Sequence, residues 1–280
     1  MDVEQRIAKA GGTLTPAERR AAEVVLERPQ LVAFGTVADL AEQSSVGAAT
    51  VVRLASKLGF DGFSALQSAV QRGLARQLRP AHERIRERGN VDNLEHHVQL
   101  EVENVRTTLG GLDPATLELA AQRLSAGEAS VWVVSGDASL GVVRQFVDDL
   151  STLRDGVHLI DSNPVRVTRQ VSMIRADDAV VAVDVRRYDR WVVDLVGAAR
   201  AAEPWCLAVT DRLLSPLAGL ADATVVVAAG GVGPFDSHVG TLALFNVIVA
   251  AVADRVRESA ASRLDRAESA WRAAQALVEG

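Results

Sequence analysis

The chain has 280 residues, 48% of them hydrophobic and 24% charged, a composition typical of a soluble globular protein. A single cysteine, Cys206, excludes an intrachain disulfide, and the first ten residues lack the apolar stretch of a secretory signal. The longest weakly polar run, residues 239–253, is shorter than the ~20 residues that a membrane-spanning helix needs. We therefore expect a cytoplasmic protein with one or two domains and no membrane partner.

The formal net charge of −6 is unevenly distributed along the chain. Residues 1–89 contain 13 basic and 10 acidic side chains, whereas residues 90–280 contain 17 basic and 26 acidic side chains. A locally positive segment of this kind is what a phosphate-binding module requires. Ordinary solvated helix faces would give the same count, so charge alone does not decide between the two interpretations.

The first 75 or so residues are predicted to form short helices. Residues 15–18, Thr-Pro-Ala-Glu, form a capping box with proline at the first helical position, and this helix should end before Pro29. A second helix should begin after Thr36, and a third should span residues 48–58 until Gly59 ends it. A fourth helix follows.

Residues 37–58 have the spacing of a helix-turn-helix. Leu40, Val46, Val51 and Leu54 can pack the two helices together, and Ser45 takes the turn position that often holds glycine. In this geometry the second helix enters the major groove of DNA. The alternative is a generic helical hairpin without a role in DNA binding.

The outer face of the second helix supplies the candidate contacts to DNA. Arg53 is its long hydrogen-bond donor and the best candidate for a bidentate contact to guanine, whereas Thr50 and Lys57 are better placed for phosphates. Val52 or Ala49 could meet a thymine methyl group. The predicted DNA-binding residues are Ala48, Ala49, Thr50, Val52, Arg53, Ser56 and Lys57.

Residues 78–93 are polar and highly charged, and we expect them to link a domain of residues 1–77 to a domain of residues 94–280. The second domain should open with a helix whose residues Leu94, Val98, Val102, Val105 and Leu109 lie in register. Asp113 should cap the next helix.

From residue 130 onward, short apolar runs alternate with helical segments. The predicted strands are residues 130–135, 157–160, 179–184, 205–210 and 223–227. The segments between them, around residues 142–153, 164–174, 191–201 and 215–220, have helical patterns. Because each strand is nearly all apolar, both faces of the sheet should be covered. The predicted fold is an α/β protein in which a helical domain precedes a doubly wound, five-stranded parallel sheet.

In such a sheet, ligands bind beyond the carboxyl ends of the strands. The polar side chains predicted there are Ser135, Asp137, Ser139, Asp184, Arg186, Arg187, Thr210 and Ser237. Arg186 or Arg187 could hold a phosphate or carboxylate, or could instead pair with Asp137, Asp184 or Asp189. We expect structural rather than catalytic roles for His238 and Cys206.

Three stretches resemble the N-terminal domain of RpiR-family regulators. They are residues 14–20 (LTPAERR), 49–53 (ATVVR) and 57–63 (KLGFDGF). Residues 95–255 resemble, more loosely, the sugar isomerase (SIS) domain that follows in that family. One departure is Gly47-Ala48, where the family often has Ser-Glu, which predicts a weaker cap on the recognition helix.

The resemblance also implies what the second domain binds. In SIS domains the first loop resembles Gly-x-Gly-x-Ser and holds a phosphosugar, and Ser139 matches that serine. Ser135 and Asp137 replace the two glycines, and Asp137 would repel a phosphate unless a cation offsets it. Many SIS domains also have a Ser-x-Ser/Thr cluster after the third strand, where this chain has arginines. The implied effector is a small anionic sugar-like molecule, a sugar phosphate or sugar acid.

The sequence as a whole predicts a DNA-binding transcriptional regulator that binds a double-stranded operator as a homodimer or homotetramer. No nucleotide-binding loop or metal-ligand cluster is visible, so we expect no catalysis, no cofactor and no metal site. One alternative is a SIS-type sugar-phosphate isomerase. The other is a DNA-binding oligomer that takes no ligand.

Overall fold

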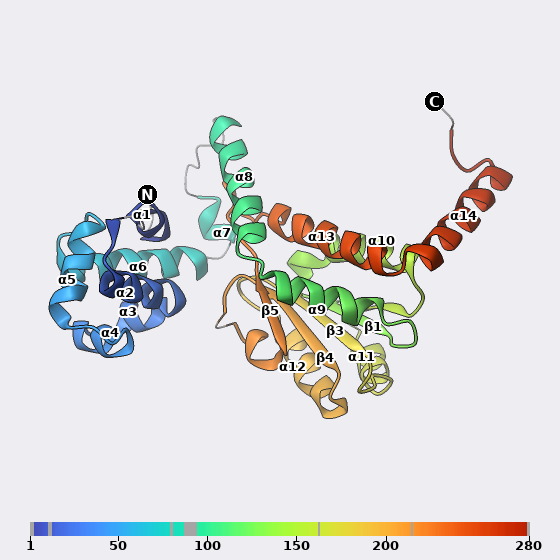
Figure 1. Cartoon of the computed structure of the whole chain (residues 1–280), viewed down its shortest axis with the longest axis horizontal. Coiled ribbons are helices and arrows are strands. Elements are labelled where there is room, and N and C mark those ends of the chain that lie inside the picture. Colours follow the sequence, from blue (N-terminus) through green and yellow to red (C-terminus); the bar gives the residue numbers. More distant parts are fainter. Residues whose placement is uncertain are drawn as a thin grey trace. The chain divides into compact units, whose positions relative to one another are not determined.

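The computed structural model describes residues 3–10, 13–78, 81–86, 94–161, 163–213 and 215–278. The chain divides into two compact units, Met1–Pro80 and Ala81–Gly280 (Figure 1). The division falls within the predicted linker, residues 78–93. The short helix α7, Ala81–Arg84, lies in that stretch, and residues 79–80 and 87–93 are outside the described residues.

The first unit is helical. Its elements are α1 Val3–Ala10, α2 Pro16–Glu27, α3 Pro29–Phe34, α4 Val37–Gln43, α5 Ala48–Lys57 and α6 Gly62–Leu78. The predicted capping box at Thr15 and Glu18 is present, and Thr36 and Asp39 form a second one at the start of α4. Helix α3 was not predicted from the sequence, because its six residues are too few to show a helical period.

Helices α4 and α5 form the predicted helix-turn-helix. Leu40, Val51 and Leu54 are fully buried in the core of the first unit, and Val46 packs against that core. Ser45 has a φ of 51°, the left-handed turn conformation that favours glycine. Gly47 is the N-cap of α5 and makes no side-chain capping bond, so the predicted weak cap is confirmed.

The second unit contains a five-stranded parallel sheet. Its strands are β1 Val131–Ser135, β2 Val157–Ile160, β3 Ala179–Asp184, β4 Trp205–Thr210 and β5 Ala223–Val226. They lie in the order β2-β1-β3-β4-β5, and each pair of neighbours is parallel. The predicted strands agree with these to within one residue at either end, because both faces of the sheet are covered.

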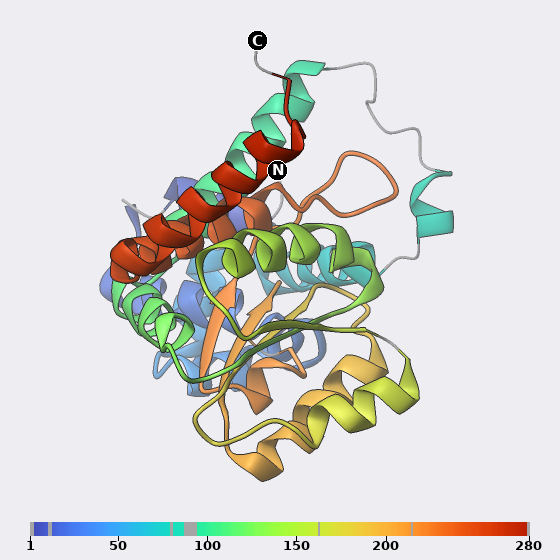
Figure 2. The same ribbon diagram turned by 90° about the vertical axis from the view of Figure 1, so that its right-hand side faces the viewer.

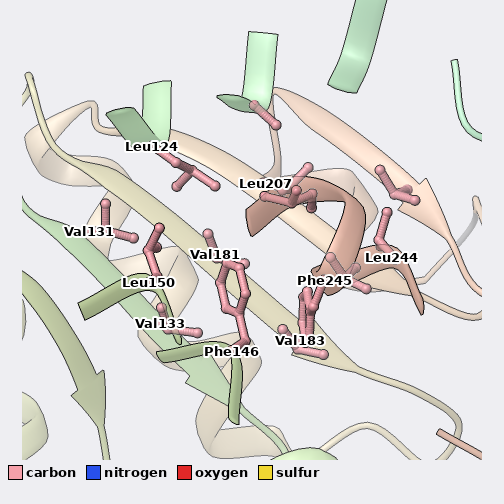
Figure 3. Close-up of a cluster of buried hydrophobic side chains, with 14 of the residues drawn as sticks. Leu124, Val131, Val133, Phe146, Leu150, Val181, Val183, Leu207, Leu244 and Phe245 are labelled. Atoms are coloured by element: carbon pink, nitrogen blue, oxygen red, sulfur yellow. The ribbon is translucent and has the colours of Figure 1, made fainter. Parts of the chain in front are cut away.

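Helices cover the sheet on both faces. They are α8 Leu94–Gly110, α9 Pro114–Ser125, α10 Leu140–Leu153, α11 Pro164–Val171, α12 Arg190–Ala199, α13 Val239–Arg255 and α14 Arg257–Ala274. Helices α9, α10 and α13 pack on one face and α11 and α12 on the other, as Figures 1 and 2 show. Phe146 of α10 and Phe245 of α13 stack with ring centroids 4.3 Å apart at the centre of the first of these layers (Figure 3).

At the amino end of the sheet, Asp178 is buried and satisfies three donors. Its carboxylate accepts hydrogen bonds from the amides of Ser130 and Arg175 and from the indole nitrogen of Trp132. Because a buried carboxylate needs such partners, Asp178 fixes the start of β1 against the start of β3. We regard this residue as structural.

The helix expected at the start of the second unit is α8, and the first part of its apolar stripe is exposed, with Leu94 at 75%, Val98 at 52% and Val102 at 40%. The buried side of this helix instead carries Asn104 and Thr108. These two side chains hydrogen-bond to the backbone of residues 228–230 and hold α8 against the chain that follows β5.

One expectation for the second unit is wrong, namely a helix at residues 215–220. The chain there forms only the 3-10 turn Ala218–Leu220. In the part of the chain that the structure describes, no single helix is long and apolar enough to span a membrane. Helices α13 and α14 reach that level only when taken together, and they are bent by 103° at their junction.

Candidate functional site

The outer face of α5 is the first candidate site. Ala48, Ala49, Val52, Arg53 and Ser56 are all exposed, as predicted for a helix that lies in a groove of DNA. The side chains on the opposite face are buried in the core of the first unit. The guanidinium of Arg53 therefore stands on a rigid and otherwise uncharged surface.

Thr50 does not lie on this exposed face. It is 8% exposed, and its Oγ1 accepts a hydrogen bond from Nη2 of Arg53 at 2.9 Å. The threonine that the sequence predicts as a phosphate contact thus fixes the orientation of the arginine. The position in the helix explains this role, since side chains three residues apart lie on neighbouring turns.

Lys57 is also engaged within the unit. Its ammonium lies 2.6 Å from Oε2 of Glu18, whose side chain is 3% exposed, and 3.3 Å from the carbonyl oxygen of Thr13. Lys57, together with the capping bond from Thr15, lowers the pKa of Glu18 to about 2. The lysine therefore links the end of α5 to the start of α2, whereas the sequence predicted only a contact to a DNA phosphate.

The second candidate site lies at the carboxyl ends of β1 and β3. In the order β2-β1-β3, the chain leaves β1 towards one face of the sheet and β3 towards the other. Doubly wound sheets bind their ligands at such a point, and we call the place between the two loops the β1–β3 crevice. Gly136 and the 3-10 turn Asp137–Ser139 follow β1, and residues 185–189 follow β3. The topology brings these two loops together as the sequence predicted.

Several side chains at this edge are buried without a partner. Ser135, Ser139, Thr210 and Thr241 are at most 3% exposed, and their hydroxyl oxygens make no hydrogen bond. Buried hydroxyls without partners cost free energy, so they mark places where a ligand or ordered water is accommodated. Thr241, in the first turn of α13, was not predicted, because a threonine in a long apolar helix gives no sequence signal.

Asp184 is the buried acid of the site. It is 3% exposed, and its Oδ2 accepts a hydrogen bond from the backbone amide of Asp189 at 2.7 Å. Burial, and then the nearby carboxylates of Asp189 and Asp211, raise its pKa to about 7. A group that titrates near neutral pH in a crevice is a candidate functional residue.

The two arginines after β3 differ. Arg186 donates to Oδ1 of Asp236 at 2.8 Å, so its partner is none of the three aspartates expected from the sequence. Arg187 is exposed, and no ion pair of its guanidinium occurs among the described residues. Both have left-handed backbones, with φ of 42° and 40°. Two consecutive strained residues are costly, which is typical of a loop whose shape serves a function.

The remaining predicted residues have internal partners. The hydroxyl of Ser237 donates to Glu101 of α8 at 2.5 Å, and this bond anchors the start of α13 rather than the crevice. His238 is partly buried, and burial lowers its pKa. Cys206 is buried in β4, where burial raises the pKa of its thiol, as expected for a core cysteine.

Together, a helical unit with a helix-turn-helix and a doubly wound α/β unit are the domain arrangement of a two-domain transcriptional regulator. The helix-turn-helix domain model of the rpiR family matches residues 1–77, and the SIS domain model matches residues 141–251. The chain therefore combines a helix-turn-helix domain of the rpiR family with a SIS domain that follows it.

Known proteins agree with this assignment. An HTH-type transcriptional regulator from Caldanaerobacter subterraneus is 24% identical over 91% of both chains. The sugar isomerase domain of an RpiR transcription factor from Sphaerobacter thermophilus is 27% identical, with a TM-score of 0.59 over 62% of this chain and 97% of that one. The NanR protein of Vibrio vulnificus, solved in complex with ManNAc-6P, is 23% identical, with a TM-score of 0.57 over 96% and 97%.

Proposed function

We propose that the affinity of this regulator for its operator is set by a small, anionic, sugar-like effector bound at the carboxyl ends of the strands. The observation that supports this best is the set of buried hydroxyls without partners, Ser135, Ser139, Thr210 and Thr241. A polyhydroxylated ligand can satisfy such groups, and the NanR relative was solved with a sugar phosphate. We propose that the protein acts in the cytosol and not as an enzyme.

On DNA, we propose that α5 lies in the major groove and that Arg53 reads a guanine. The hydrogen bond that Arg53 donates to Thr50 holds the guanidinium in place, which reduces the entropy lost on binding. Ala49 and Val52, both exposed, are small or apolar enough to approach a thymine methyl group. Ala48 and Ser56 complete the face, whereas Lys57 acts chiefly within the domain.

We further propose that the protein is a homodimer or homotetramer. One helix-turn-helix covers one half-site, so specific binding generally needs two copies. The exposed stripe Leu94, Val98 and Val102 on α8 is an apolar surface that a second copy of the chain would bury.

A gel shift on the gene's own upstream region, with and without a panel of sugar phosphates and sugar acids, tests the proposed function. We expect specific binding that one class of these compounds changes, because effector and operator are thermodynamically coupled. Arg53→Ala should lower operator affinity by about 1–3 kcal/mol, whereas Arg20→Ala removes an exposed charge on α2 and serves as the control. If no compound in the panel moves the gel shift or the melting temperature, the ligand-independent oligomer replaces this proposal. Turnover of a sugar phosphate would favour the isomerase.

A further inference from the structure

The crevice between β1 and β3 is bridged by the chain itself. The backbone amide of Asp137, in the loop after β1, donates to Oδ2 of Asp189, in the loop after β3, at 2.9 Å. Amides in the loop after the first strand of such a sheet are where an anionic ligand would be held. In this chain a carboxylate of the protein takes that amide.

Asp189 makes this bond instead of a local one. It is the N-cap residue of α12, yet it makes no side-chain capping bond to that helix. A capping aspartate contributes about 1 kcal/mol to a helix, so the side chain gives up a favourable local position to reach across the crevice. The bridge between the loops is therefore a specific feature and not a by-product of helix capping.

Asp184 brings a second carboxylate to the same point. A Cβ atom placed on Gly136 would lie 2.6 Å from its carboxyl carbon, so the carboxyl group lies directly against the loop after β1. The neighbouring Thr210, its register partner on β4, projects from the same face of the sheet. Thr210 is fully buried, and its hydroxyl makes no hydrogen bond.

In the part of the chain that the structure describes, Asp137, Asp184 and Asp189 form no ion pair. Two arginines of the surrounding loops pair with other aspartates instead. Arg186 pairs with Asp236, and Arg212 pairs with Asp211. A phosphate dianion entering here would meet uncompensated negative charge at short range, which is strongly unfavourable at the low dielectric of a buried site.

We propose that Asp184 and Asp189 determine ligand specificity by excluding phosphate from the β1–β3 crevice and accepting hydrogen bonds from hydroxyl or ammonium groups of the effector. The anionic group of the effector then lies at the outer end of the site, near the exposed Arg187. This inference rests on the proposed function only for the location of the effector. It assigns the ligand an orientation in which the polyol or amino end enters first.

Inorganic phosphate is the first probe, titrated into the full-length wild type and into the double variant Asp184→Asn with Asp189→Asn. Binding is followed by calorimetry and by the chemical shift of the Asp137 amide. Asn keeps the size of each side chain and removes the charge, so the variant should bind phosphate at least ~10-fold more tightly. Asp194→Asn, on the exposed side of α12, makes the same kind of charge change and should leave phosphate binding unchanged. The single variant Asp189→Asn serves if the double variant does not fold.

Two outcomes overturn the proposal: equal phosphate binding at this loop in wild type and variant, or no phosphate binding in either. D-Glucosamine is the second probe, and it should bind the wild type and lose at least ~10-fold in affinity in the variant. If the wild type does not bind glucosamine, the proposed hydrogen bonds from the effector to Asp184 and Asp189 are wrong. Because the titrations contain no DNA, their result can be interpreted even if the gel-shift test of the proposed function fails.

Discussion

Two buried carboxylates, Glu18 in the first unit and Asp184 in the second, are in opposite electrostatic situations. Glu18 accepts hydrogen bonds from Lys57 and from the backbone of Thr15, and its pKa lies at about 2. Asp184 is buried to a similar extent beside other acids, and its pKa lies at about 7. Burial alone therefore does not set the pKa of an acid, because the donors and charges that surround the carboxylate decide the direction of the shift.

The largest expected effect is on the compensated acid. Glu18→Ala removes the capping box of α2 and the partner of Lys57, and it should lower the free energy of unfolding by about 2–3 kcal/mol. Calorimetry of the full-length chain measures this. Glu23→Ala, an exposed glutamate on the same helix, is the control and should change stability by less than ~0.5 kcal/mol.

The sign of the pH dependence follows from the same pKa. Because the pKa of folded Glu18 is below its unfolded value, its contribution to stability is present above about pH 4.5. It should be lost as the pH falls towards 2. A Glu18→Gln variant with the acid stability profile of the wild type would show that the pair with Lys57 does not form in solution.

For the uncompensated acid, the sign is reversed. The raised pKa of Asp184 means that its neutral form favours the folded state, so this contribution is present below about pH 4 and lost as the pH rises to about 7. Asp184→Asn should therefore stabilise the protein at pH 8, by roughly 1–3 kcal/mol, and flatten the profile between pH 4 and 7. Denaturant melts at both pH values measure this, with Asp194→Asn as the matched exposed control. A destabilising effect at pH 8 would mean that the Asp184 carboxylate is compensated after all.

Lys57 offers a direct choice between the two roles assigned to it. If its ammonium is committed to Glu18, Lys57→Gln should lower stability by roughly 1 kcal/mol and leave the salt dependence of DNA binding unchanged. If it contacts a phosphate, the slope of log affinity against log salt should fall by roughly 1 instead. Gel shifts at several salt concentrations separate these results, and Arg53→Ala provides the comparison for a residue at the DNA surface.

The smallest expected effect concerns the uncapped start of α5. Gly47 has φ −78° and ψ 150°, and a Cβ atom there would contact nothing within 4 Å. Gly47→Ser can therefore add a capping hydroxyl and should stabilise the protein by a few tenths of a kcal/mol. Thermal unfolding measures the gain, and Gly47→Ala, which adds no hydroxyl, should not reproduce it.

The fold was predictable from the sequence where local pattern and burial agree. The strands are continuous apolar runs because both faces of the sheet are covered, and the capping boxes at Thr15 and Thr36 are local motifs. On α8 the helical pattern was predicted, but the burial of its two faces could not be inferred from the sequence. An apolar stripe indicates a surface that packs against a partner, and the pattern does not show whether that partner belongs to the same chain. Asn104 and Thr108 are buried because the backbone of residues 228–230 needs them.

The location of the candidate site was predictable from the sequence, but the hydrogen bonds between its residues were not. Parallel topology brings the loops after β1 and β3 together, so residues such as Ser139 and Asp184 could be named from their positions. Which acid pairs with which donor depends on geometry across more than 40 residues of sequence. Asp189 was predicted only as a possible partner of the arginines, and its bond to the Asp137 amide had no local signal. Likewise, nothing in the sequence of α5 indicates that Lys57 reaches back to Glu18.

The division of the chain into two units has a spectroscopic consequence. All four tryptophans, Trp132, Trp191, Trp205 and Trp271, belong to the second unit, and the first unit contains none. Intrinsic tryptophan fluorescence therefore reports on the second unit alone, whereas far-ultraviolet circular dichroism reports on both units. Trp191 lies two residues after Asp189, in the first turn of α12. A ligand that displaces the Asp189 side chain should therefore change the tryptophan emission, which can be measured without a label and without DNA.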